Sequence, residues 1–285
     1  MRCAEQTAQF VRSMYNKPQS ETYLKKTTDA AMSVPTNSAI PLLSKIDKPV
    51  QLFNSSVCGT TELTLTVATK PSPVESESGY SGSMQLLVED VALDRPMVIQ
   101  WEHQMTDDEY FQFCQINQDL RIERTAQGDL LIMPPAGFES GYRNNELSRQ
   151  LANWALEDGR GLAFDSNTEY ILPKGAAYSP DASWVLQSRL TTLTKEQKRK
   201  FPPLCPDFVV ELMSPSDRLS KAKAKMEEWI ANGAQLGWLL DPDHRTVHIY
   251  RPNREPEQVV NAERLVGEGP VAGFTLELAD IWTGL

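Results

Sequence analysis

The 285-residue sequence predicts an α/β fold, in which a central mixed β-sheet is flanked by helices and preceded by a poorly ordered N-terminal region. Two observations predict this organisation. From about Pro96 onward, amphipathic helical segments alternate with short apolar strands, as in a sheet covered by helices. Residues 1–90 instead contain 22 Ser and Thr, against 18 in the remaining 195, without a sustained hydrophobic period. We therefore expect a largely disordered region at 1–95 and a folded domain at 96–285.

The N-terminal region contains two stretches that depart from this pattern. TTELTLTVAT, residues 60–69, alternates apolar and polar residues well enough to predict a strand. Residues 79–97 are a second candidate for local structure. An alternative expectation is that residues 1–95 are a tail arising from an upstream start, with translation beginning near Met97 or Met105.

Caps, turn signals and apolar spacing predict the elements of the folded domain in order. Thr106-Asp-Asp-Glu109 is a capping box that opens a helix ending near Ile116. Gln127-Gly128-Asp129 separates two apolar runs and predicts a hairpin. The predicted strands are 120–124, 130–133, 162–164, 169–172, 181–185, 207–213, 236–240 and 247–251, and the further predicted helices are 142–158 and 217–232.

Composition and charge exclude several classes of function. No run of about 18 apolar residues occurs and no signal peptide opens the chain, so a membrane span is not expected. The four cysteines lack CxxC spacing and only three histidines are present, which argues against a zinc site or a disulfide framework. We expect a reduced, cytoplasmic protein. A formal net charge of −10 argues against binding of nucleic acid through a large basic surface, because such binding depends on Lys and Arg that neutralise phosphates.

The stretch CPDFVVELMSPSDR, residues 205–218, places Asp207 and Glu211 in an apolar strand. Residues four apart on a strand share a face, and buried like charges are unfavourable unless a cation lies beside them. Asp181 follows Pro180 as Asp207 follows Pro206. If these strands are neighbours, Asp181 and Glu211 converge on one Mg²⁺, which prefers hard oxygen ligands. The alternatives are a turn-capping role for Asp207 and a structural salt bridge for Glu211.

The helix that follows supplies candidate cations for these carboxylates. The helical spacing of its apolar residues defines one apolar side. Lys221 then faces solvent, and Lys223 and Lys225 lie at the two opposite edges of that apolar side. Either marginal lysine is within reach of the strand, where it would stabilise charge that develops on a phosphodiester. Periodicity does not choose between the two.

These residues carry a resemblance to a known family. The run from Met97 to Trp282 resembles the Uma-type restriction endonuclease family, within the PD-(D/E)XK nuclease superfamily. The shared stretches, in order, are RIERTAQGDLLIMPP, SPDASWV, PPLCPDFVVELMSPSDR, KMEEWIANGAQLGWLLDP, VHIYRP and GFTLELADIW.

The resemblance implies a restriction-endonuclease-like core that hydrolyses DNA with Mg²⁺, for which Mn²⁺ is an expected substitute. It implies Asp181 and Glu211 as metal ligands and Lys225 as the catalytic lysine. Glu123, which matches another recurring acid of the family, and Asp207 are further metal candidates. The sequence departs from the superfamily pattern at Met213, two residues after Glu211, where a lysine is usual.

Two further expectations accompany this resemblance. By analogy with restriction nucleases of this fold, we expect a homodimer. The rival hypothesis is a catalytically inactive nuclease-fold protein that acts as a binding or interaction module. Its support is the acidic net charge and Met213 in place of the usual lysine.

Overall fold

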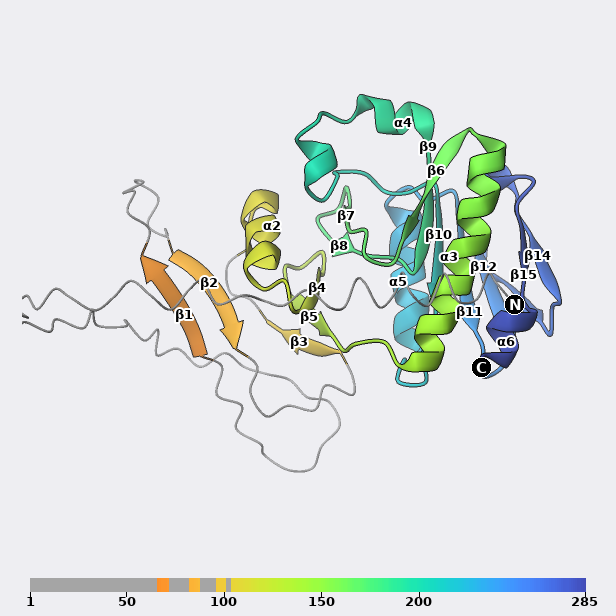
Figure 1. Cartoon of the computed structure of the whole chain (residues 1–285), viewed down its shortest axis with the longest axis horizontal. Helices are drawn as coiled ribbons and strands as arrows, with labels where there is room; N and C mark the ends of the chain where they lie inside the picture. Colours follow the sequence, from red (N-terminus) through yellow and green to blue (C-terminus); the bar gives the residue numbers. More distant parts are fainter. Residues whose placement is uncertain (1–65, 72–81, 88–95, 101–103) are drawn as a thin grey trace, which may run out of the picture. The chain divides into compact units, whose positions relative to one another are not determined.

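The computed structural model describes residues 66–71, 82–87, 96–100 and 104–285 (Figure 1). Most of the region expected to be disordered, and residues 60–65 of its predicted strand, lie outside these ranges. The remainder of that predicted strand falls in β1 (Thr66–Pro71), which pairs antiparallel with β2 (Gly82–Leu87). Within the described ranges, no helix is long and apolar enough to cross a membrane.

A six-stranded mixed sheet forms the centre of the fold, as the sequence predicts. Its order is β13-β12-β11-β10-β9-β6. β10 and β11 are parallel and are joined through a helix, whereas the other neighbours are antiparallel. Its strands are β6 (Gly161–Asp165), β9 (Ala182–Leu186), β10 (Phe208–Leu212), β11 (Leu236–Asp241), β12 (Thr246–Tyr250) and β13 (Glu257–Val260).

A second sheet of five short strands has the order β3-β5-β4-β8-β7. The predicted hairpin joins β4 to β5, and Gly128 in its turn has φ +94°, a conformation that favours glycine. The predicted capping box at Thr106 opens α2 (Asp107–Ile116), whose Tyr110 and Phe113 are buried. The strands are β3 (Met97–Ile99), β4 (Arg121–Arg124), β5 (Leu130–Met133), β7 (Tyr170–Ile171) and β8 (Ala177–Tyr178).

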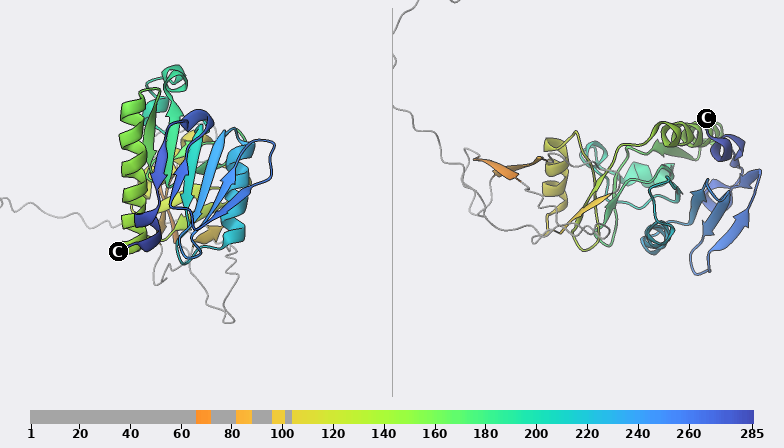
Figure 2. Two further views of the ribbon diagram at one scale, coloured as in Figure 1. Left: turned by 90° about the vertical axis from the view of Figure 1, so that its right-hand side faces the viewer. Right: turned by 90° about the horizontal axis from the view of Figure 1, so that it is seen from below.

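Two helices cover opposite faces of the six-stranded sheet, α3 (Phe138–Asp158) and α5 (Leu219–Ala231) (Figure 2). The alternation of β10 produces this arrangement. Phe208 and Val210 pack in the core that includes α3, and Val209 packs with Met226 and Trp229 of α5. Glu211 lies two residues after Val209 and therefore points to the same face of the sheet, the face covered by α5.

Smaller elements complete the fold. They are α4 (Gln187–Thr192), β14 (Arg264–Val266), β15 (Thr275–Glu277), α6 (Ala279–Thr283) and the 3₁₀ turns Gln197–Arg199 and Gly269–Val271. The largest difference from the predicted boundaries is in α3, which begins four residues before the expected Tyr142. Its N-cap is Gly137, which has no side chain with which to signal the helix start.

Candidate active site

Strand register brings the carboxylates of Asp181 and Glu211 together. β9 and β10 pair antiparallel with Val210 opposite Ala182, so the next pair in this register is Glu211 and Asp181. The backbone N–H of Leu212 donates to Oδ2 of Asp181 at 2.7 Å, which fixes the aspartate beside the end of β10. The two segments that share a Pro-Asp sequence are thus neighbouring strands, as the sequence argument required.

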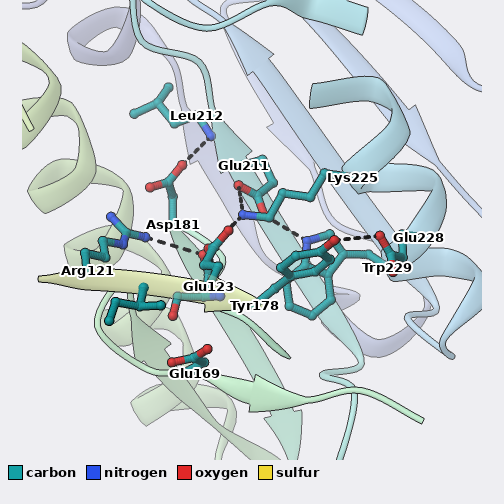
Figure 3. Close-up of polar contacts among 12 residues, drawn as sticks. Arg121, Glu123, Glu169, Tyr178, Asp181, Glu211, Leu212, Lys225, Glu228 and Trp229 are labelled. Carbon is teal, nitrogen blue, oxygen red and sulfur yellow. Dashed lines mark hydrogen bonds and ion pairs between the residues drawn. The ribbon is translucent and has the colours of Figure 1, made fainter. Parts of the chain in front are cut away.

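Glu123 reaches the same place from β4 of the other sheet (Figure 3). Its side chain is 2% exposed. Oε1 accepts hydrogen bonds from the backbone N–H of Ser179 and from Nζ of Lys225, each at 3.1 Å. The five-stranded sheet therefore contributes a third carboxylate to the two from the central sheet.

Lys225 of α5 lies among these carboxylates. Its Nζ is 3.0 Å from Oε1 of Glu211 and 3.1 Å from Oε1 of Glu123, so one ammonium bridges two strands from different sheets (Figure 3). Lys223 lies instead near His248, where burial and then the charge of Lys223 lower the pKa of the imidazole. Of the two lysines that periodicity left open, the structure brings Lys225 to the site.

Asp207 is not part of this cluster. Its Oδ2 accepts from the backbone N–H of Leu186 at 2.9 Å, and its Oδ1 accepts from Nη1 of Arg189 at 2.7 Å. Four residues of extended strand separate it from Glu211, a displacement of roughly 13 Å along β10. The two acidic residues share a strand, but Asp207 caps the opposite end, the turn-capping role that the sequence left as its alternative.

Two residues that were not predicted from the sequence as part of the site donate hydrogen bonds to the carboxylates expected to bind the metal. The indole N–H of Trp229 donates to Oε1 of Glu211 at 2.8 Å. Nδ2 of Asn144, on α3, donates to Oδ1 of Asp181 at 3.0 Å. Trp229 lies four residues after Lys225, so helical spacing alone places them on one face. No local pattern marks Asn144, because its contact joins segments 37 residues apart.

The surroundings alter the protonation of these groups. Burial raises the pKa of Asp181 above its ordinary value. Burial raises the pKa of Glu211 to about 7, against the opposing effect of Lys225 and with contributions from Asp181 and Glu123. For Lys225, burial disfavours the charged form, but the three carboxylates outweigh it and raise the pKa. The ammonium is therefore charged at neutral pH and stabilises an acidic cluster.

The donor set fits a hard divalent cation in its chemistry. Carboxylate oxygens are the ligands that Mg²⁺ prefers. Three carboxylates outnumber the two cations near them, the ammonium of Lys225 and the guanidinium of Arg121, whose charge opposes the rise in the pKa of Asp181. Oδ1 of Asn144, on the amide that binds Asp181, is buried and has no hydrogen-bond partner among the residues that the structure describes, so a water molecule entering here would satisfy it. As they stand, however, no three His, Cys, Asp or Glu side chains of the described ranges are arranged to hold a metal ion.

Comparison with known proteins supports the resemblance seen in the sequence. A family profile described as "Putative restriction endonuclease", Uma2, matches residues 107–279. The chain belongs to the Uma2 family. The match includes both strands and the helix that carry Asp181, Glu211 and Lys225. No curated protein matches the chain.

A solved structure shows the same fold as this Uma2 family member. It is described as a "putative nuclease belonging to DUF820" from Anabaena variabilis ATCC 29413. The two align with a TM-score of 0.51 and 21% identity, over 63% of this chain and 98% of the other. The α/β fold that the sequence predicts, with a central mixed sheet flanked by helices, is therefore confirmed.

Proposed function

We propose that this chain is a divalent-metal-dependent endonuclease that hydrolyses phosphodiester bonds in DNA. The observation that carries the proposal is the position of Lys225, whose ammonium contacts Glu211 and Glu123 beside the strand that positions Asp181. Membership of the Uma2 family supports the reaction class. A buried cluster of carboxylates with one lysine provides the groups that metal-assisted phosphodiester hydrolysis needs.

Asp181 and Glu211 would hold the cation, and Glu123, which shares the ammonium of Lys225 with Glu211, is a further candidate ligand. When bound, Mg²⁺ supplies Lewis acidity that polarises a phosphoryl oxygen and acidifies water. The backbone N–H of Leu212 and the amide of Asn144 fix Asp181 before substrate arrives. Such preorganisation reduces the rearrangement required in the transition state.

Lys225 would serve the reacting phosphate. Its ammonium carries three donors and no acceptor, so it can orient an attacking water or stabilise charge on the phosphoryl oxygens. Its side chain is 21% exposed, so part of the lysine borders solvent. The lysine comes from a helix and not from the position of Met213, yet it contacts the same glutamate.

A second candidate is a nuclease-fold protein without turnover, acting as a binding module. One observation favours it, which is that the ammonium of Lys225 lies between Glu123 and Glu211 and satisfies both without a metal. A protein of this kind has no need to bind Mg²⁺ or Mn²⁺ at the carboxylates. Metal affinity therefore separates the two candidates.

The test is nicking of supercoiled plasmid by the purified full chain at low salt with Mg²⁺ or Mn²⁺. The endonuclease proposal predicts nicking that stops with EDTA and falls about 100-fold or more in Glu211→Gln. Folded wild type that neither nicks DNA nor binds Mn²⁺ would instead support the binding module.

A further inference from the structure

Trp229 is a core residue whose indole N–H contacts the candidate site. The side chain is fully buried in the core between α5 and the central sheet, and its indole N–H donates to Oε1 of Glu211 at 2.8 Å (Figure 3). Packing alone does not require such a bond. Trp184 is also fully buried, and its Nε1 has no hydrogen-bond partner among the described residues.

Trp229 and Lys225 act on the same carboxylate in different ways. They lie four residues apart on one face of α5, and both reach Glu211. Lys225 offsets the charge of the carboxylate. The indole N–H is a neutral donor, so it restrains the carboxylate without adding a second positive charge beside it. The terminal torsion of glutamate is otherwise soft, and a bond to one oxygen fixes the direction of the other.

The indole is itself held in place. Tyr178 packs edge-on against Trp229 with ring centroids 5.9 Å apart, and the tyrosine hydroxyl donates to Oε2 of Glu228 at 2.8 Å. Glu228 precedes Trp229 on α5, so helix and β8 together set the angle of the ring. The ring of Tyr178 also lies 5.3 Å from Nζ of Lys225. One aromatic pair thus supports both groups that contact Glu211.

We propose that Trp229 is a positioning residue: its indole N–H holds Oε1 of Glu211, so that Oε2, which accepts a hydrogen bond from Nζ of Lys225 at 3.3 Å, keeps a fixed direction toward the divalent cation. This inference rests on the proposed function, because it assumes that Glu211 is a metal ligand. Residues that hydrogen-bond to metal ligands orient them, and their loss typically lowers metal affinity by about 10–100-fold.

The experiment compares Trp229→Phe with Trp184→Phe in the full chain. Each variant removes one buried indole, but only the first removes a bond to Glu211. Free Mn²⁺ is measured by electron paramagnetic resonance during titration, and plasmid nicking is measured against Mg²⁺ concentration. We expect Trp229→Phe to raise both the Mn²⁺ Kd and the half-saturating Mg²⁺ concentration about 10-fold, with most of the rate restored at saturating Mg²⁺. Trp184→Phe should leave both values unchanged.

A third variant guards against simple misfolding. Replacement of Trp229 by 3-benzothienylalanine keeps the shape of the ring and exchanges the N–H group for sulfur. Wild-type Mn²⁺ affinity in this variant overturns the inference, even if Trp229→Phe unfolds. If wild type binds Mn²⁺ and nicks DNA, and the 3-benzothienylalanine variant does so equally well, the role of Trp229 is refuted but the proposed function is not. Wild type that does neither defeats the proposed function and this inference with it.

Discussion

Nζ of Lys225 lies 3.0 Å from Oε1 of Glu211, although the lysine is on a helix and the glutamate on a strand of the central sheet. The same ammonium is 3.1 Å from Oε1 of Glu123. Burial raises the pKa of Glu211 to about 7 even with this cation beside it. The lysine therefore stabilises Glu211 and Glu123 inside the fold, and Arg121 also favours the ionised form of Asp181.

Removal of this ammonium should destabilise the protein as well as stop the reaction. Lys225→Met leaves Glu123 and Glu211 buried without their cation, and loss of one partner of a buried pair costs about 3–5 kcal/mol. Because the lysine side chain is 21% exposed, we expect a value near the lower end of that range at pH 7.

Lys221→Met is the matched control, because Lys221 is exposed on the same helix and its loss should change stability by less than about 0.5 kcal/mol. Urea unfolding followed by tryptophan fluorescence measures both variants. Equal midpoints for the two would contradict the role of Lys225 as the internal counter-ion.

Asp207 should matter for stability and not for the reaction. Asp207→Ala removes the acceptor for the backbone N–H of Leu186 and the partner of Arg189, so we expect a loss of about 1–3 kcal/mol. Urea unfolding measures the loss, and Asp207→Asn, which retains one acceptor oxygen, should lose less. A metal-dependent increase in wild-type stability that disappears in Asp207→Asn would show that Asp207 is a ligand after all.

Glu169 should make stability decrease with rising pH. Burial raises its pKa to about 8, against the hydrogen bond that the Tyr110 hydroxyl donates to it at 2.7 Å, whereas its ordinary value is 4.5. Between those values the folded state binds the proton that the unfolded state has lost. The contribution of Glu169 is therefore fully present below pH 4.5 and is lost as pH rises through about 8.

The test compares wild type with Glu169→Gln by urea unfolding at pH 5, 6, 7 and 8. The slope that one such group adds is at most about 1.4 kcal/mol per pH unit, and the variant should lack it. Some slope should remain in the variant, because the pKa of Glu211 is raised in the same direction. Identical slopes in the two proteins would show that Glu169 is ionised at neutral pH.

Local chemistry explains which parts of the fold were predictable from the sequence. The capping box at Thr106 and the turn at Gly128 act within a few residues, so their elements were predicted closely. The start of α3 was missed because its N-cap, Gly137, has no side-chain signal. The disorder and domain boundary expected near residue 96 stay predictions.

The candidate site was predictable where spacing or family resemblance carried the information. Resemblance indicated Asp181, Glu211, Lys225 and Glu123, and the structure brings them together, although their roles stay predictions. Asp207 was a less direct candidate, taken from the strand alternation that puts it on the same face as Glu211. Alternation says nothing about distance along the strand, and the structure places Asp207 at the other end. The bond from Asn144 to Asp181 depends on how α3 packs against the sheet, which no local pattern encodes.

Nicking rates in Mg²⁺ show whether Asp181 and its neighbours form one hydrolytic site. Asp181→Asn and Asp207→Asn should be assayed beside wild type, each normalised to its folded fraction. We expect Asp181→Asn to lower the rate about 100-fold or more and Asp207→Asn to leave it unchanged. Wild-type nicking by folded Asp181→Asn would contradict the assignment of the site.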